Sequence, residues 1–234
     1  MKAVKKLFMS CNWTNLLYIN FKIDKDIINA MLPKDLEADL FEGDALLSFV
    51  GFRFTNARLH GIKIPFHQYF PEINLRTYVR SKINPIEKGI YFISEMVPKF
   101  MTYFVGKFFY DEPFTKIGVK EKSDSNLFGY NISDKKNNIS MFCHFSMDDI
   151  DLQKNREEEF VIDRVFAFCG KNGENSKKYE VRHKKWKLLK ISEPVFFYEN
   201  LNHLPKSLHE VILNRIPCSI FVTDGSAVDV FRVF

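Results

Sequence analysis

Short runs of alternating apolar and polar residues recur along the chain and predict a protein built mainly of β-strands. Gly, Pro, Asn and Asp between the runs are typical of the turns that join strands. The expected strands are 15–23, 37–41, 45–54, 72–80, 90–96, 114–122, 127–133, 138–147, 179–190, 194–198, 219–223 and 227–234. The runs 37–41 and 45–54 flank Glu42-Gly43-Asp44, which predicts a hairpin. The strand pair 72–80 and 90–96 follows a long connection over 55–71.

Helical spacing of apolar residues is confined to a few segments. Asp24 offers an N-cap for a short helix that Pro33 stops, and Gly170 is a C-terminal stop for another. The expected helices are 25–32, 98–109, 156–168 and 206–215. No linker, repeat or low-complexity tract divides the chain, so we expect one α+β domain over 1–234. We expect its core to be a large antiparallel sheet, and the pattern leaves both an open sheet and a closed barrel as alternatives.

Composition supports a folded chain rich in sheet. The chain has 234 residues, of which 46% are apolar and 25 are Phe, and Phe favours the pleated surface of a strand. The 34 Lys and Arg exceed the 29 Asp and Glu by five, a modest charge that excludes a disordered, highly charged chain. No apolar run is long enough for a signal peptide or a membrane span, so we expect a soluble, cytoplasmic protein with no membrane partner.

The common signatures of enzyme chemistry are missing from the sequence. Glycine-rich phosphate loops, a Gly-x-Ser-x-Gly elbow and a His-Glu-x-x-His zinc motif do not occur. The four cysteines lie far apart, and His60 and His67 on a loop make a weak metal pair. We therefore expect no metal and no cofactor.

The strand 72–80 carries the most informative pattern. A period of two places Glu72, Asn74, Arg76, Tyr78 and Arg80 on one face, and apolar side chains on the other. A polar strand face is usually the solvated outside of a sheet. The functional alternative is that this face lines a barrel interior, where the planar fork of an arginine could orient a small carboxylate.

Two lysines and one basic segment are further candidates. Lys22 shares a strand face with Tyr18 and Asn20, and Lys116 shares one with Phe114, although such lysines are more often exposed. The basic segment 177–190 combines six lysines with Tyr179 and Trp186. Because no nucleic-acid motif surrounds this segment, a solvated strand pair is the favoured interpretation, and nucleic acid is not an expected partner.

Several stretches resemble one bacterial family. They are Trp13-Thr14-Asn15-Leu16-Leu17, the segment 31–43, Phe70 to Arg80 with Gly89 to Ser94, the segment 159–168, and Val181-Arg182-His183-Lys184-Lys185-Trp186. They are similar to the uncharacterised YqjF-like family over roughly 13–198, and that family belongs to the acetoacetate decarboxylase superfamily. The resemblance implies that the large antiparallel sheet closes into an acetoacetate decarboxylase-like β-barrel, open or conical, with flanking helices around an interior cavity.

The resemblance also implies which decarboxylase residues are kept. That enzyme forms a Schiff base through a lysine of a Pro-Lys-Lys motif, which is replaced here by Pro113-Phe114-Thr115. The resemblance aligns its cavity arginine with Lys22, one of its glutamates with Glu72, and its other glutamate with a position near Val50. We therefore do not expect an acetoacetate decarboxylase.

Three hypotheses follow from these patterns. The first is a protein that binds a small carboxylate or carbonyl compound in the barrel, with Lys22, Glu72, Arg76 and Tyr78 lining the cavity. The second is an enzyme that acts on a keto or hydroxy acid through Glu72 or Lys116. The third is an interaction module that uses the basic 177–190 surface. The direction of the Glu72 and Arg76 side chains discriminates the first hypothesis from a solvated strand face.

Overall fold

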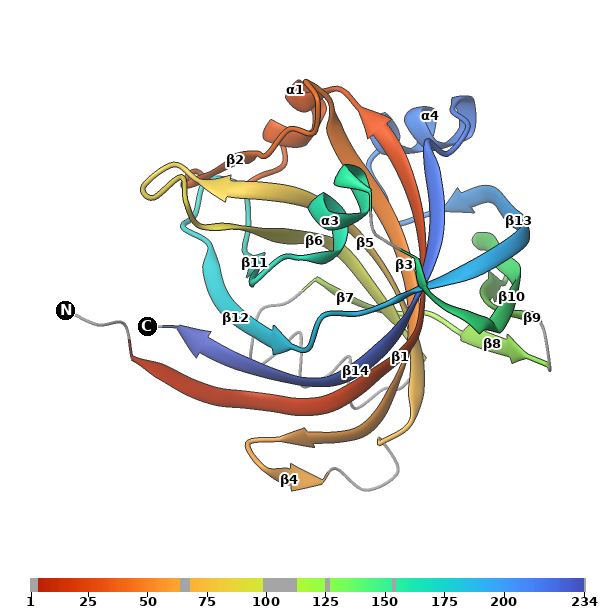
Figure 1. The fold of residues 1–234 in the computed structure, drawn as a ribbon. Coiled ribbons are helices and arrows are strands. Elements are labelled where there is room, and N and C mark those ends of the chain that lie inside the picture. The colour runs from red at the N-terminus through yellow and green to blue at the C-terminus, as the bar shows by residue number, and fades with distance from the viewer. Residues whose placement is uncertain (1–3, 64–67, 99–112, 125–126, 153–154, 234) are drawn as a thin grey trace.

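One 14-stranded sheet dominates the fold, and seven of its strands close into a barrel (Figure 1). The computed structural model describes residues 4–63, 68–98, 113–124, 127–152 and 155–233. The pairing of β1 with β14, from Lys5 opposite Val233 to Asn20 opposite Ser219, closes the ring. In spatial order the barrel strands are β1 (Lys5–Ile23), β3 (Ala45–Leu59), β5 (Phe70–Ser81), β6 (Lys88–Val97), β11 (Phe166–Cys169), β12 (Lys177–His183) and β14 (Ser219–Val233).

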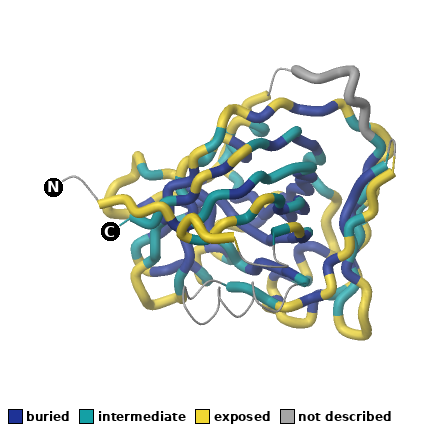
Figure 2. Tube along the Cα trace, turned by 90° about the horizontal axis from the view of Figure 1, so that it is seen from below, coloured by how far each residue is buried: buried dark blue, intermediate teal, exposed yellow. Residues whose placement is uncertain are grey.

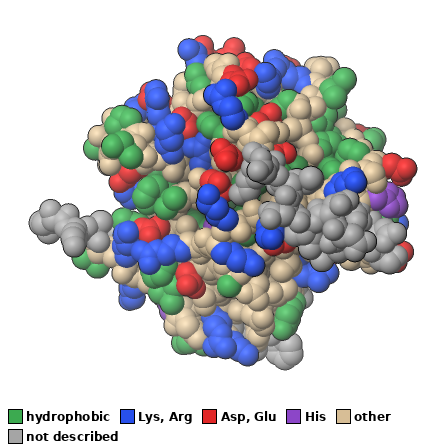
Figure 3. Space-filling view, viewed as in Figure 1, with side chains coloured by type: hydrophobic (Ala, Val, Ile, Leu, Met, Phe, Trp, Pro, Cys, Tyr) green, Lys and Arg blue, Asp and Glu red, His purple; other side chains and the backbone are tan. Residues whose placement is uncertain are grey.

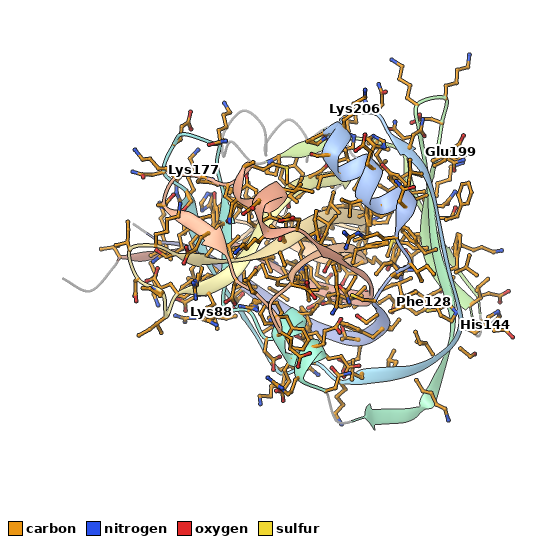
Figure 4. The ribbon with its side chains drawn as sticks, turned by 90° about the horizontal axis from the view of Figure 1, so that it is seen from above. Lys88, Phe128, His144, Lys177, Glu199 and Lys206 are labelled. Carbon is orange, nitrogen blue, oxygen red and sulfur yellow. The ribbon has the colours of Figure 1, made fainter. Side chains whose placement is uncertain are left out.

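The remaining strands extend or border the barrel. Four of them run from β14 as an outer layer, namely β13 (Leu188–Leu201), β10 (Asn137–Leu152), β9 (Leu127–Ser133) and β8 (Val119–Ser123). Figure 4 shows this layer through its labelled residues Phe128, His144 and Glu199, on the side opposite Lys177 of β12. Three short strands pair with barrel strands, namely β2 (Leu36–Ala38) with β5, β4 (Ile62–Lys63) with β3, and β7 (Phe114–Lys116) with β6.

Three helices occur among the described residues, namely α1 (Lys25–Asn29), α3 (Arg156–Ile162) and α4 (Lys206–Asn214). Asp24 caps α1 as expected, because its side chain accepts a hydrogen bond from the Asp26 backbone. A capping box of Asn155 and Glu158 begins α3. Within the described residues, no helix has the length and apolar character that crossing a bilayer requires.

Two apolar cores lie on opposite faces of the barrel wall. Every barrel strand contributes to the inner core, which includes Tyr18, Val50 and Phe221, and α3 adds Val161 and Ile162 to it. The outer core lies between the barrel and the β8–β10, β13 and α4 layer, and its members include Phe21, Phe49 and Tyr130. Figure 2 shows buried segments along the barrel strands and exposed segments at the turns. A strand between two cores is buried on both faces.

The expected barrel and the hairpin of β5 with β6 are confirmed, but some local predictions are wrong. The strand near 37–41 does not pair with 45–54, because β2 pairs with β5, and only Phe41 and Asp44 form a bridge. The expected helix 156–168 ends at Ile162 and is followed by strand β11. The expected connection 55–71 is largely strand, with a turn at His60 and Gly61. The expected helix 98–109 lies almost entirely outside the described residues.

Gly51 marks a close approach between the two layers. A Cβ atom at this position would overlap the ring of Tyr130. That ring cannot move easily, because Tyr130 is fully buried and its hydroxyl donates to the Asn15 carbonyl at 2.8 Å. We expect Gly51→Ala to lower the free energy of unfolding by about 1–3 kcal/mol through overpacking.

Urea unfolding measures this effect, and Gly118→Ala is the matched control. A Cβ atom at Gly118 meets nothing within 4 Å, so this variant should change stability by less than about 0.5 kcal/mol. Equal stability of the two variants would contradict the close packing of Tyr130 on β3.

Candidate functional site

The polar face of β5 points into the barrel. Glu72, Asn74, Arg76 and Tyr78 are all buried, whereas Arg80 at the end of the row is exposed. Tyr78 belongs to the inner core, and the alternate residues Ile73, Leu75 and Val79 belong to the outer core. The solvated-face interpretation of this strand is therefore wrong from Glu72 to Tyr78.

Arg76 is a buried cation among aromatic rings. Its residue is 7% exposed, and its Cζ lies 5.3 Å from the centre of the Tyr18 ring and 5.8 Å from that of Tyr78. Nη2 donates to the Val161 carbonyl over 3.4 Å, and buried Nε has no hydrogen-bond partner. No carboxylate of the described residues pairs with this guanidinium, which stays charged at ordinary pH.

Tyr18 supplies a buried hydroxyl next to this cation. The ring stacks on Phe221 with 4.7 Å between centroids. Burial raises the pKa of Tyr18 to about 12, although the nearby Arg76 charge acts in the opposite direction. The hydroxyl is therefore protonated at neutral pH. The hydroxyl lies beside the Arg76 guanidinium and Thr223 Oγ1, but within the described residues neither it nor buried Thr223 Oγ1 makes a hydrogen bond of standard distance and angle.

Tyr78 is the last member of a chain of hydrogen bonds that runs from α3 across strands β14, β1, β3 and β5. Its Oη lies 2.8 Å from Ser48 Oγ, and Ser48 donates to Asn20 Oδ1 over 2.5 Å. Asn20 Nδ2 donates to Ser219 Oγ over 2.8 Å, and Ser219 donates to Glu157 Oε1. Strand register explains the chain, because Asn20 lies opposite both Ser48 on β3 and Ser219 on β14.

Two buried carboxyl groups lie in another part of the interior wall. Glu72 accepts a hydrogen bond from Asn74 Nδ2 over 3.3 Å, and Glu95 on β6 lies opposite Asn74. Burial, with Glu72 as a further cause, raises the pKa of Cys11. Four residues along one strand separate Glu72 from Arg76, which is roughly 13 Å. This distance separates the two backbone positions, and among the described residues the Arg76 guanidinium forms no ion pair with the Glu72 carboxylate.

The two candidate lysines are outside this cluster. Lys22 follows Asn20 on the same face of β1, but at the barrel rim its side chain is 49% exposed and pairs with Asp44 at 2.9 Å. Lys116 is exposed at the end of β7, where Phe114 lies opposite Glu95. The structure brings Glu72, Arg76 and Tyr78 into the interior and leaves both lysines at the surface.

The basic 177–190 segment contains basic side chains that form ion pairs. Lys178 binds Glu87 at 2.7 Å, and Arg182 binds Glu180 at 2.6 Å. On the face that Figure 3 shows, Lys and Arg side chains are interspersed with Asp and Glu. Several basic residues of the segment therefore have acidic neighbours instead of forming a uniform phosphate-binding stripe.

A groove of about 420 Å³ runs along the outside of α3. Phe41, Phe160 and Arg164 line it, and buried Arg164 pairs with Asp39 at 2.7 Å. Arg164 Cζ lies 5.4 Å from the Tyr78 ring centre, while Arg76 also contacts that ring. The buried Tyr78 ring thus lies between Arg164, which lines the groove, and Arg76 of the interior cluster. Among the described residues, no three His, Cys, Asp or Glu side chains gather in a metal-binding geometry.

Sequence patterns alone did not identify Asn20, Ser48 and Tyr18 as neighbours of Arg76. The alternation of Tyr18, Asn20 and Lys22 on the first strand was a signal that the face is polar. Ser48 lies in an apolar run with no such signal. Only the register of β3 against β1 and β5 places Ser48 between Asn20 and Arg76.

The reactivity of the Cys218 thiol depends on the charge of the neighbouring Glu157 carboxylate. Its Sγ lies 3.8 Å from Glu157 Oε1, and burial followed by the Glu157 charge raises the pKa of Cys218 to about 11. The other cysteines are buried. We expect the native protein to react with one equivalent of a thiol reagent, slowly at pH 8 and about tenfold faster per pH unit up to about pH 10, as the thiolate fraction rises.

Glu157→Gln removes the charge, so we expect a lower pKa of Cys218 and faster labelling at pH 8. Stopped-flow absorbance with a chromogenic disulfide measures the rate. Glu159→Gln changes the same charge on the exposed side of α3 and should leave the rate unchanged. A rate that is the same in Glu157→Gln and the unmodified protein would show that the carboxylate does not act on the thiol.

Comparison with known proteins places the chain among barrels of one architecture. It is 15% identical to acetoacetate decarboxylase from Legionella pneumophila, with a TM-score of 0.66 over 97% of this chain and 87% of that one. The enduracididine biosynthesis enzyme MppR, solved in complex with pyruvate, is 9% identical with a TM-score of 0.62 over 97% and 89%. At these identities the likeness shows the fold alone.

Sequence comparison gives the family. The chain is 31% identical over 137 residues to the uncharacterized protein YqjF of Bacillus subtilis, covering 58% of this chain and 55% of that protein. The matched part of the chain thus spans about half the length of that relative. The family model of an uncharacterized conserved protein, DUF2071, matches residues 10–209. The chain therefore belongs to the DUF2071 family, with an acetoacetate decarboxylase-like barrel as its fold.

Proposed function

We propose that this protein binds a small carboxylate or carbonyl compound inside its barrel, with Arg76 holding the anionic group. The observation that carries the proposal is the buried Arg76 guanidinium, which has no carboxylate partner among the described residues. A neighbour of the same fold, MppR, is described in complex with pyruvate, a small keto acid. That likeness supports the class of ligand, while the residues of this chain indicate where the ligand binds.

The surroundings of Arg76 do not balance its charge. Removing an ion from water costs several kcal/mol even after the protein relaxes. A cation over an aromatic ring recovers about 0.5–2 kcal/mol, and the end of a helix about 0.3–1 kcal/mol. Tyr18, Tyr78 and the Val161 carbonyl therefore offset part of the cost. Five N–H groups make up the donor fork of an arginine. One of them donates to the Val161 carbonyl, and the Tyr18 and Tyr78 hydroxyl oxygens also lie within reach of the fork.

A bound carboxylate would complete this environment. Its two oxygens match the planar fork of Arg76, and the protonated hydroxyl of Tyr18 offers a further donor beside the same cation. The backbone position of Glu72 lies roughly 13 Å along the strand from that of Arg76. Glu72 is placed to accept a hydrogen bond from the far end of a longer ligand or to act as its acid or base.

The positions of the lysines favour binding over covalent amine chemistry. A Schiff-base lysine is activated by removal from water or by a neighbouring cation. Lys116 is exposed, and Phe114 and Thr115 occupy the positions that the resemblance assigns to the paired lysines of the decarboxylase. Reversible binding at Arg76 is therefore the function that the described residues support best.

Replacing Arg76 by methionine tests the proposal. We expect Arg76→Met to raise the stability of the free protein, by about 1–4 kcal/mol, because an unpaired buried charge is replaced by apolar volume. The same variant should lose any thermal shift that millimolar pyruvate, lactate or acetoacetate gives with the unmodified protein. Differential scanning fluorimetry measures both effects.

Arg80→Met is the matched control, because Arg80 is exposed on the same strand and pairs with Glu37 at 2.6 Å. This variant should keep the ligand-induced shift. The proposal is wrong if the acids shift the unfolding temperature of Arg76→Met as much as that of the unmodified protein, or if none of the three acids binds either protein.

A further inference from the structure

The hydrogen-bond chain that ends at Tyr78 has a defined direction. It connects Glu157 on α3 with Ser219 on β14, Asn20 on β1, Ser48 on β3 and Tyr78 on β5. Asn20 and Ser48 are fully buried, and Ser219 and Glu157 are partly exposed. Figure 1 shows α3 placed over the barrel strands from which the other members come. The chain therefore links a surface helix to the ring beside Arg76.

The carboxylate at the outer end sets the direction of every bond. An ionised carboxylate only accepts, so Ser219 uses its single hydrogen on Glu157. Ser219 Oγ must then accept, which places the amide nitrogen of Asn20 toward it and the amide oxygen toward Ser48. Ser48 uses its only hydrogen on that oxygen. The remaining bond of Ser48 can form only if Tyr78 donates to it.

This direction gives the two tyrosines opposite roles. The hydrogen of the Tyr78 hydroxyl is committed to Ser48, so Tyr78 Oη presents only lone pairs to the interior. The hydroxyl of Tyr18 has no partner among the described residues, so its hydrogen is available to a ligand. Both rings lie against the Arg76 guanidinium, at 5.3 and 5.8 Å from Cζ. An acceptor and a donor thus flank one anion-binding group.

We propose that Tyr78 selects 2-hydroxy carboxylates over 2-oxo carboxylates, and that Glu157 is the positioning residue that gives Tyr78 this selectivity. The inference rests on the proposed function, because it assumes a carboxylate at Arg76. A hydroxyl beside the carboxylate can accept from Tyr18 and donate to Tyr78. A keto oxygen can only accept, and it would meet the lone pairs of Tyr78 without a hydrogen between them.

The expected discrimination is about tenfold, the effect of one net hydrogen bond in a buried site. A 2-oxo carboxylate would leave the buried Tyr78 oxygen without a hydrogen-bond donor, and this cost disfavours its binding. The selectivity should therefore disappear when Tyr78 loses its hydroxyl, or when the hydrogen bonds from Tyr78 to Glu157 no longer have one fixed donor-to-acceptor direction. Glutamine at position 157 removes the direction, because its amide can donate to Ser219 and allow each bond to reverse.

Isothermal titration calorimetry of the full chain with L-lactate, D-lactate and pyruvate tests the proposal. We expect one lactate enantiomer to bind about tenfold more tightly than pyruvate. In Glu157→Gln and in Tyr78→Phe the ratio should fall to about one or below. Glu159→Gln, with the same charge change on the same helix, should keep the ratio of the unmodified protein.

Each result decides between the two levels of the proposal. Binding that depends on Arg76 but favours pyruvate, or a ratio that persists in Glu157→Gln, would overturn the selectivity while leaving the proposed function intact. The absence of binding by both lactates and pyruvate would overturn the selectivity, and the absence of acetoacetate binding as well would overturn the proposed function on which it rests.

The direction of the chain can also be read in the free protein. With ¹³C-labelled tyrosine, a slowly exchanging hydroxyl proton of Tyr78 should show contacts with the β-protons of Ser48, and Tyr78→Phe assigns it by its loss. In Glu157→Gln this signal should shift or exchange faster. A Tyr78 hydroxyl signal that is identical in Glu157→Gln and the unmodified protein would show that Glu157 does not position it.

Discussion

The pairing of β1 with β14 is the constraint on which the interior depends. It runs from Lys5 opposite Val233 to Asn20 opposite Ser219, and β1 pairs with β3 along its other edge. A closed ring of strands has an inner face that side chains must fill, with no free edge through which backbone groups reach water. Each polar side chain on that face therefore needs a partner inside the barrel.

Arg76 shows what this enclosure does to a charge. On an open sheet the same guanidinium would be solvated, and its presence would indicate little about function. Inside the closed barrel the guanidinium contacts the rings of Tyr18 and Tyr78 and donates to the Val161 carbonyl over 3.4 Å. Arg164 provides the contrast, since its side chain is also largely removed from solvent but pairs with Asp39 at 2.7 Å. One buried arginine is thus part of a structural ion pair, while the other lacks the partner that a structural role would provide.

The sequence predicted the strands of the barrel better than the surroundings of the side chains inside it. Strand period correctly grouped Glu72, Asn74, Arg76 and Tyr78, because a period of two holds wherever a strand is regular. Whether that group faced water or the interior depended on closure by β14, which lies about 200 positions along the chain from β1. Only the family resemblance indicated this closure. The alternation of apolar and polar residues also does not predict β-bulges. One occurs in β1, whose register with β3 shifts between Thr14 and Leu17, where Asn15 has a φ of 57°. Beyond that bulge the inward positions change from odd to even residues.

The contacts that define the chemistry come from register, which local patterns do not contain. Asn20, Ser48 and Arg76 lie on three strands, and pairing sets them opposite one another in a single row. A shift of β3 by one residue would turn Ser48 to the outer core and interrupt the row. Because each hydrogen bond in the row leaves its neighbour a single choice, the charge of Glu157 at the surface determines what Tyr78 offers beside Arg76. Under the proposed function, a chain with Phe114 and Thr115 at the positions that the resemblance assigns to the paired lysines of the decarboxylase would discriminate between ligands through hydrogen-bond direction, without a covalent amine.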